Sequence, residues 1–234
     1  MTYIFRQLLD YESNTFTYLL GDAITRRALL IDPVLEMLGR DVKLLGELGL
    51  DLVYAINTHV HADHITSSGK LKRSFPQMKS VLGSLGNELA LADIKVQNGN
   101  VLQVDSIALE FRSVPGHTAG CHVLVWQEEQ RVFTGDTVLV RGCGRTDFQG
   151  GNAKSLYQSV WSQVFTLSDE FAIFPAHDYK GHSQSTIGEE KQFNPRLSKP
   201  LEEFEQIMNN LNLPYPRKID VSLPANLVCG LHEV

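Results

Sequence analysis

The sequence predicts a mixed α/β fold with many short strands, and three observations support this. Apolar runs of strand length, bounded by Gly, Pro, Asn and acidic residues, recur along the chain of 234 residues. Between some of these runs, apolar residues lie three and four positions apart, which is the period of an amphipathic helix. Polar clusters follow several runs directly, at the strand ends where α/β folds usually build their sites.

The first third of the chain is predicted to hold four strands and two helices. Short apolar runs predict strands over 2–9, 15–21, 27–32 and 52–57. A helix is expected from Met37 to Gly49, because glycine suits the C-terminal end of a helix. A second helix, with a basic and solvated outer face, is expected over 64–74.

The rest of the chain continues this alternation. Further strands are predicted over 80–83, 101–104, 107–113, 121–126, 131–134 and 171–178, with the fourth and fifth of these forming a hairpin. Asn152 is predicted to cap a helix over 153–165. The polar stretch 181–200 is expected to be a loop, and a last helix is expected from Pro200 to Leu211.

The composition disfavours two classes of partner. Lys and Arg number 21 against 27 Asp and Glu, so the formal net charge is −6. An acidic chain is poorly suited to phosphate backbones and to anionic membrane surfaces. No apolar run in the sequence approaches the ~18 residues that a membrane span requires. We therefore expect no nucleic-acid partner and no membrane partner.

Cysteine usage and the amino terminus predict a cytoplasmic protein. Cys121, Cys143 and Cys229 are odd in number and widely spaced, which does not suit a disulfide framework. The first residues carry Arg and acidic side chains where a signal peptide has an unbroken apolar stretch. They also lack the Arg- and Ser-rich, acid-poor character of a transit peptide.

Four polar clusters carry the chemistry of this sequence. They are His59-Val60-His61-Ala62-Asp63-His64, Gly116-His117-Thr118, Thr134-Gly135-Asp136-Thr137 and Ala176-His177-Asp178. His59 and His61 are two positions apart, so on extended backbone their side chains share a face. Three histidines and an aspartate within one short segment are costly to bury without a cation. Imidazole suits Zn, Fe, Cu and Ni, and carboxylate compensates charge, so the clusters predict a metal site.

The remaining histidines and cysteines have weaker patterns. His122, His182 and His232 have no partner at ligand spacing and are expected to be structural or exposed. Cys121 and Cys229 are expected to act as small core residues. Cys143 lies between two glycines, and there both a role in the site and a purely structural role stay open.

The HxHxDH string at 59–64, followed by His117, Asp136 and His177, resembles the metallo-β-lactamase superfamily. The likeness begins at Thr58 and covers most of the chain. It implies an αββα sandwich, in which two mixed β-sheets lie face to face, helices lie outside, and the metal lies at one edge. Strands followed by polar loops are compatible with that architecture.

Two branches of the superfamily compete for this sequence. GDTVLVRGCGR at 135–145 resembles both glyoxalase II, the hydroxyacylglutathione thioesterase, and the persulfide dioxygenases. GRTDFQGG at 144–151 and PAHDYKGHSQSTIGEEKQFNPRL at 175–197 are more similar to the glutathione persulfide dioxygenase (sulfur dioxygenase) branch. Glyoxalase II usually has a larger helical C-terminal domain than residues 178–234 provide. The favoured interpretation is the dioxygenase, and the alternative is a dinuclear-zinc hydroxyacylglutathione hydrolase.

The domain organisation follows from the same resemblance. Residues 1–180 are expected to form the metallo-β-lactamase-like catalytic domain. Residues 181–234 are expected to be a short helical C-terminal extension packed on it.

The resemblance also implies the cofactor and the reaction. It assigns one Fe(II) per chain to His59, His117 and Asp136, which are then also the catalytic residues. Two imidazoles and one carboxylate leave positions open, as non-haem iron oxygenases require. The other cluster residues are expected to orient the ligands and water: His61, Asp63, His64 and His177. The implied reaction oxidises glutathione persulfide with O2 and water to sulfite and glutathione.

For the glutathione part of the substrate, the resemblance points to Arg145 and Tyr179. A guanidinium matches a carboxylate, and a tyrosine hydroxyl can bond a carbonyl. The alternative for Arg145 is a salt bridge to the nearby Asp147. Arg217 and Lys218 are weaker candidates for a second carboxylate, the alternative being plain solvation.

The expected partners are therefore the small-molecule substrate and O2, and a homodimer is left open. A third hypothesis, a metal-stabilised binding or sensor module without turnover, is disfavoured by the intact ligand string, because stability alone does not require an open metal edge.

Overall fold

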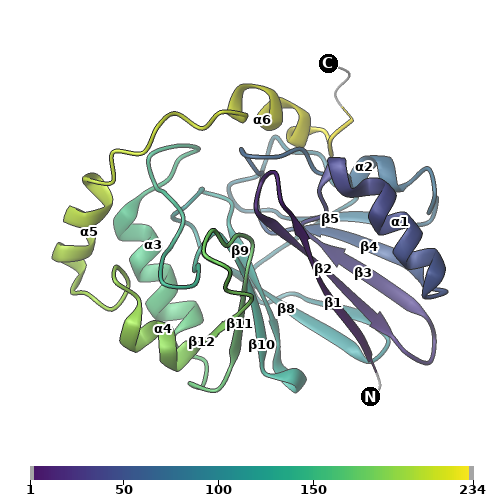
Figure 1. The fold of residues 1–234 in the computed structure, drawn as a ribbon, viewed down its shortest axis with the longest axis horizontal. Helices are drawn as coiled ribbons and strands as arrows, with labels where there is room; N and C mark the ends of the chain where they lie inside the picture. Colours follow the sequence, from purple (N-terminus) through teal and green to yellow (C-terminus); the bar gives the residue numbers. More distant parts are fainter. Residues whose placement is uncertain (1–2, 232–234) are drawn as a thin grey trace.

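Two six-stranded sheets lie face to face in the computed structural model, which describes residues 3–231 (Figure 1). The first sheet has the order β1-β2-β3-β4-β5-β6, formed by Tyr3–Asp10, Thr15–Asp22, Arg27–Ile31, Asp51–Asn57, Lys79–Gly83 and Ile94–Val96. The second has the order β12-β11-β10-β9-β8-β7, where β7 to β12 are Val101–Val104, Ile107–Ser113, His122–Trp126, Arg131–Gly135, Ala172–Pro175 and Ser185–Thr186. Both sheets combine parallel and antiparallel neighbours. The expected pair of mixed sheets is confirmed.

Helices cover the outer faces of the two sheets (Figure 1). The first sheet is flanked by α1 (Leu38–Glu47) and α2 (Ser68–Leu71). The second is flanked by α3 (Ala153–Ser159), α4 (Ile187–Phe193) and α5 (Leu201–Asn209), and α6 (Ile219–Leu227) lies at the upper edge of the view. The layer order is that of the predicted αββα sandwich. Within residues 3–231, no helix combines the length and apolar character needed to cross a membrane.

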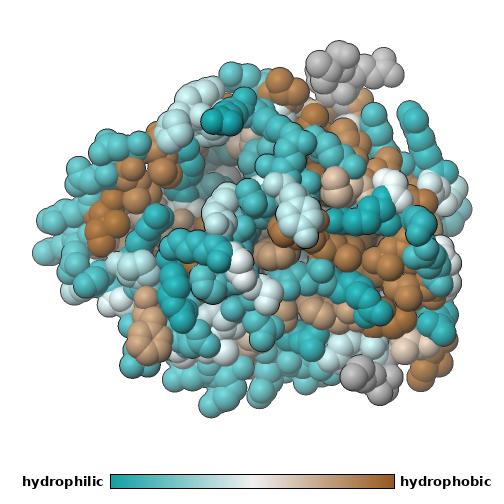
Figure 2. All heavy atoms as spheres, viewed as in Figure 1, coloured by the Kyte–Doolittle hydropathy of each residue, from teal (hydrophilic) through white to brown (hydrophobic). Residues whose placement is uncertain are grey.

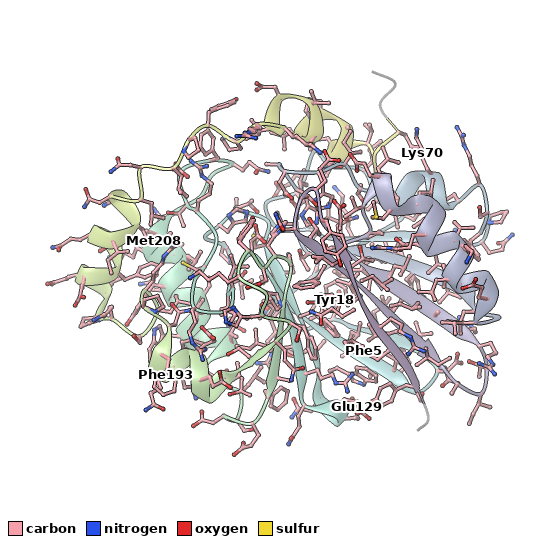
Figure 3. All side chains as sticks on the ribbon, in the orientation of Figure 1. Phe5, Tyr18, Lys70, Glu129, Phe193 and Met208 are labelled. Atoms are coloured by element: carbon pink, nitrogen blue, oxygen red, sulfur yellow. The ribbon has the colours of Figure 1, made fainter. Side chains whose placement is uncertain are left out.

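The apolar core alternates along the strands, as strand geometry requires. In β2, Tyr18 and Leu20 join the cluster between the sheets, whereas Leu19 packs toward α1. Successive side chains of a strand point to opposite faces, so a strand buried on both sides must be apolar on both. Figure 3 shows Tyr18 and Phe5 in the space between the sheets. The surface in Figure 2 is mostly hydrophilic, with smaller hydrophobic patches on the α5 side and on the β1 and α1 side.

Several local signals in the sequence are confirmed. Helix α1 is followed by Gly49 with φ +60°, where a glycine avoids the strain of a left-handed backbone. The side chain of Asn152 caps α3 by accepting a hydrogen bond from the Ser155 N–H at 2.8 Å. Strands β9 and β10 pair as the expected antiparallel hairpin.

Other expectations about secondary structure are wrong. The helix expected over 64–74 is only the single turn α2, because the residues before it form a polar loop at the sheet edge. The stretch 181–200 is not a loop throughout: it contains β12 and α4, whose Thr186 side chain accepts from the Glu189 N–H at 3.1 Å. Strand β6 and helix α6 were not expected. Helix α6 contains Pro224 and lacks the apolar stripe that signals a surface helix.

Candidate metal centre

The four polar clusters meet at one edge of the sandwich. The string at 58–64 follows β4, and His117 follows β8. Asp136 and His177 follow β10 and β11, which pair in parallel and therefore end on the same side. His177 also forms an isolated β-bridge with Thr15, at the start of β2 in the other sheet. The clusters therefore lie together at one edge, where the resemblance to the superfamily places the metal.

His59, His117 and Asp136 form a compact group of potential ligands. One ligand atom of each residue lies within 4.8 Å of the others. His117 Nε2 is 3.3 Å from Asp136 Oδ2, and the His59 and His117 ring centroids are 5.0 Å apart. Asp136 Oδ1 is buried without a hydrogen-bond partner among residues 3–231. Two imidazoles, a carboxylate and an unpartnered buried oxygen fit a divalent transition-metal ion.

Hydrogen bonds assign the tautomers of both histidines in this group. The Arg145 carbonyl lies 2.7 Å from His117 Nδ1 and can only accept, so Nδ1 donates and Nε2 is the ring atom turned toward Asp136. The Thr58 hydroxyl donates to Asp32 Oδ2 at 2.9 Å, so it accepts from His59 Nδ1 at 3.1 Å. Burial, with the nearby His61 and His117, holds the pKa of His59 well below its usual value. In both rings Nδ1 is held by a hydrogen bond to the protein, which leaves Nε2 as the atom for metal ligation.

Asp32 anchors the start of the loop 58–66, which carries the metal-binding string. It directly follows β3 and is 1% exposed. Its Oδ1 accepts from the Thr58 N–H at 2.8 Å and contacts His61 Nε2 at 3.0 Å. Burial lowers the pKa of His61, but the nearby carboxylates, first Asp32 and then Asp63 and Asp136, together raise it above its usual value. Asp32 thus reaches His59 through Thr58 and holds His61 directly.

The remaining cluster residues form a second group beside the first. Ligand atoms of His61, Asp63 and His64 lie within 4.8 Å of one another. His177 Nε2 lies 3.4 Å from Asp63 Oδ2 and 3.5 Å from Asp136 Oδ1, so it adjoins both groups. Burial raises the pKa of Asp63, but His64 and His177 bring it well below the usual value. By the chemistry of their side chains, these four residues can act either as hydrogen-bonding partners of the first group or as ligands of an ion.

Two further buried side chains, absent from the sequence-based set, hold these residues. Thr15 Oγ1 lies 3.3 Å from His64 Nδ1 and 3.4 Å from His177 Nδ1. Asn226, on α6, forms hydrogen bonds with the backbone of His61, His64 and Thr66. Asp32 could have been identified as a site residue from the sequence, because it is an acidic residue directly after a predicted buried strand and before Pro33. Thr15 and Asn226 had no such signal, because neither stands in one of the four polar clusters.

A cavity of about 640 Å³ opens beside the metal group and is lined by His117 and Asp136. The expected substrate residues Arg145, Tyr179 and Arg217 all line it. The Tyr179 ring stacks on His177, with centroids 6.0 Å apart and planes 12° apart. Lys218 does not line this cavity and instead forms ion pairs, the shorter at 2.8 Å to Glu12.

Arg145 is already engaged by the protein. It forms a two-pronged ion pair with Asp147, at 2.6 and 2.7 Å, which is the alternative that the sequence left open. Its Nη1 also donates to the Pro214 carbonyl at 2.8 Å, and the guanidinium lies over the Phe148 ring. Arg145 therefore lines the cavity while its guanidinium is already paired with Asp147.

The other described histidines and the three cysteines lie outside the ligand groups. His122 is buried and hydrogen-bonded to Ser113, and His182 is exposed, whereas His232 lies outside the described residues. Cys121 is buried, as expected, but Cys229 is only half-buried. Cys143 is buried beside Met208 and also lines the cavity.

The fold and the site together define a metal-dependent enzyme of the αββα class. The sequence model described as the Metallo-beta-lactamase superfamily matches residues 10–81 and 87–177. The persulfide dioxygenase ETHE1, mitochondrial, of Homo sapiens is 52% identical over 228 residues, covering 97% of this chain and 89% of that protein. The crystal structure of ETHE1 from Myxococcus xanthus superposes with a TM-score of 0.92 at 49% identity, covering 97% of this chain and 99% of that one. The chain belongs to the persulfide dioxygenase family of this superfamily.

The competing branch is more distant. The hydroxyacylglutathione hydrolase GloC of Haemophilus influenzae is 31% identical over 192 residues, covering 74% of this chain and 88% of that protein. The preference for the dioxygenase branch, drawn from the segments 144–151 and 175–197, is therefore confirmed. The protein is an oxidoreductase.

Proposed function

We propose that the protein binds one Fe(II) per chain through His59, His117 and Asp136 and oxidises glutathione persulfide. The reaction consumes one O2 and one water and yields glutathione, sulfite and two protons. The observation that carries the proposal is the meeting of two imidazoles and one carboxylate within 4.8 Å, in a chain about half identical to persulfide dioxygenases. Iron, when bound, supplies the redox chemistry that joins O2 to sulfur.

The chain's own residues prepare this site before any substrate arrives. His59 is neutral at physiological pH because its pKa is lowered by burial and by its histidine neighbours. The Arg145 carbonyl orients His117, and the Asp32–Thr58 pair orients His59. Imidazoles that are already correctly turned need no rearrangement to bind a metal.

We assign the second group the role of orienting the first, without a second metal. His177 and Asp63 contact each other, and His177 also contacts Asp136. A second dication about 3.5–4 Å away would occupy the face that substrate and O2 need. His61, Asp63, His64 and His177 then act as hydrogen-bonding partners of the ligands and of water.

For the substrate, we assign Arg145, Tyr179 and Arg217 to the glutathione part. All three line the same cavity as His117 and Asp136, so a ligand can reach the metal group and these side chains together. Guanidinium groups match the carboxylates of a peptide, and the tyrosine hydroxyl matches a peptide carbonyl.

The experiment that tests this function combines metal analysis with oxygen uptake. Freshly purified protein should contain about one iron per chain, and with glutathione persulfide it should form sulfite and consume O2 in a one-to-one ratio. Sulfite formed under strict anaerobiosis, or a chain active only with zinc, would overturn the proposal.

The second candidate is the dinuclear-zinc hydroxyacylglutathione hydrolase. It is favoured by the second ligand group and by the likeness to GloC. Such an enzyme would release glutathione from S-lactoylglutathione without oxygen. A binding or sensor module would do neither reaction, so the same assays separate all three hypotheses.

Three further assignments are also proposals. Residues 1–180 form the catalytic domain, and 181–234 form an extension packed on it, supported by the contacts of α5 with α3. A cytoplasmic location is supported by three free cysteines, although the human, mouse and bovine relatives carry the word mitochondrial in their names. Fractionation tests the location, and sedimentation equilibrium tests for a homodimer.

A further inference from the structure

Asn226 connects the C-terminal helix α6 to the loop that carries the metal-binding string. Its side chain is 7% exposed. Its Nδ2 donates to the carbonyls of His61 and His64, both at 2.8 Å, and its Oδ1 accepts from the Thr66 N–H at 2.8 Å. One planar amide therefore holds three points of the loop from about 160 residues away in sequence.

The chemistry of the three partners leaves this amide one orientation. Two backbone carbonyls can only accept, so the NH2 group must face His61 and His64. A backbone N–H can only donate, so the oxygen must face Thr66. Both donors of the amide are used, and a buried amide satisfied in this way has little freedom to move.

The end of α6 is seated on the same loop. The Gly69 N–H donates to the Cys229 carbonyl at 2.9 Å. Gly230 has φ +73°, and a Cβ added there would lie 2.0 Å from the Thr66 carbonyl oxygen. The backbone thus approaches Thr66 so closely that only glycine fits. These contacts place α6 against the loop independently of the Asn226 side chain.

We propose that Asn226 is a positioning residue for the metal centre, which fixes the curvature of the loop between His61 and Thr66. Asp32 holds the beginning of the string through Thr58 and His61, and Asn226 holds its end. With both ends held, His59 and the second group keep their places without a metal. The C-terminal helix, which contributes no ligand, then sets the affinity of the site. The inference rests on the proposed metal centre but not on the persulfide reaction.

Metal affinity tests this role without any substrate. Asn226→Asp keeps the shape and the oxygen that faces Thr66 but puts an oxygen against two carbonyls, and Asn226→Ala removes all three bonds. Each variant should raise the dissociation constant for Fe(II), measured anaerobically, by about tenfold, the low end of what loss of a ligand's own partner costs, because Asn226 acts on the loop and not directly on a ligand.

The matched control is Leu45→Ala, which removes a buried side chain from the cluster between α1 and the first sheet. It should lower the melting temperature while leaving the Fe(II) dissociation constant within about twofold of wild type, because it touches no support of the loop. Unchanged affinity in both Asn226 variants, or a loss no larger than in Leu45→Ala, would overturn the proposal.

Hydrogen exchange on the unaltered protein gives a second test that needs no variant. Binding and positioning are reciprocal, so Fe(II) alone should protect the amides of α6 as well as those of 58–66. Helix α5, which packs on α3, serves as the internal control and should not respond. Protection confined to 58–66 would overturn the proposal. Because neither test uses persulfide or O2, a failure of the proposed reaction would leave both results standing.

Discussion

The Nε2 atom of His61 lies 3.0 Å from Oδ1 of Asp32, with both side chains 1% exposed. This contact leaves His61 Nδ1 as a buried atom without a hydrogen-bond partner among residues 3–231. The same carboxylate holds Thr58, so one residue orders the first part of the loop. A buried charge with this many partners is costly to alter, because each partner left behind must also be desolvated.

The first prediction concerns Asp32→Asn. Asparagine tolerates the φ of +50° at this position but offers one acceptor oxygen in place of two. We expect the free energy of unfolding of the metal-free protein to fall by about 1–3 kcal/mol, measured by urea denaturation. Asp105→Asn is the matched control, because Asp105 also has φ +50° but pairs with Arg27 at the surface. Its loss should stay below about 1 kcal/mol. Equal losses would contradict the role given to Asp32.

The second prediction separates the two ligand groups. His59→Ala, His117→Ala and Asp136→Ala should each strip the iron, because each removes a ligand of the only metal proposed. His64→Ala and His177→Ala should leave most of it bound, since these residues orient the ligands without binding the ion. Elemental analysis of the purified variants gives the iron per chain. Two metals per active chain would revive the dinuclear hydrolase.

The third prediction concerns Arg145→Ala. If Arg145 binds a substrate carboxylate, kcat/KM for glutathione persulfide should fall. The decrease should correspond to a loss of about 2–4 kcal/mol in transition-state stabilisation, with iron content unchanged. Asp147→Asn removes the ion pair seen at 2.6 Å but leaves the guanidinium in the cavity, so kcat/KM should be preserved. Unchanged kinetics in Arg145→Ala would leave Arg145 a structural role only, in its ion pair with Asp147 and its contacts with Pro214 and Phe148.

The fourth prediction concerns the reactivity of Cys143. Burial raises its pKa to about 11, so at pH 8 only about one thiol in a thousand is the reactive thiolate. Because the folded pKa is raised, alkylation by iodoacetamide should accelerate as the pH rises toward 11. At pH 8, mass spectrometry should find the half-buried Cys229 labelled before Cys143 and Cys121. Labelling of Cys143 as fast as Cys229 would show a reactive thiol in the cavity.

The sequence by itself determined the chemistry of the site and most of the strands. Apolar runs and their polar ends are local patterns, so β2, β3, β4 and the hairpin of β9 and β10 were predictable. The ligand types were also local, because three histidines and an aspartate stand within 59–64. Helix α4 was not predicted because most of its residues are polar. Helix α6 was not predicted because its apolar residues form no helical stripe and its sequence contains Pro224, which disfavours a helix.

Only the tertiary structure decided which side chains hold the residues of the metal centre. Asp32 meets His61 across 29 positions, Thr15 meets His177 across 162, and Asn226 meets His61 across 165. The guanidinium of Arg145 forms an ion pair with Asp147. Such contacts leave no period or spacing in the chain, because a hydrogen bond depends on the distance between two atoms after folding. The sequence therefore specifies what can bind a metal, and packing of the two sheets and α6 specifies how those groups are held.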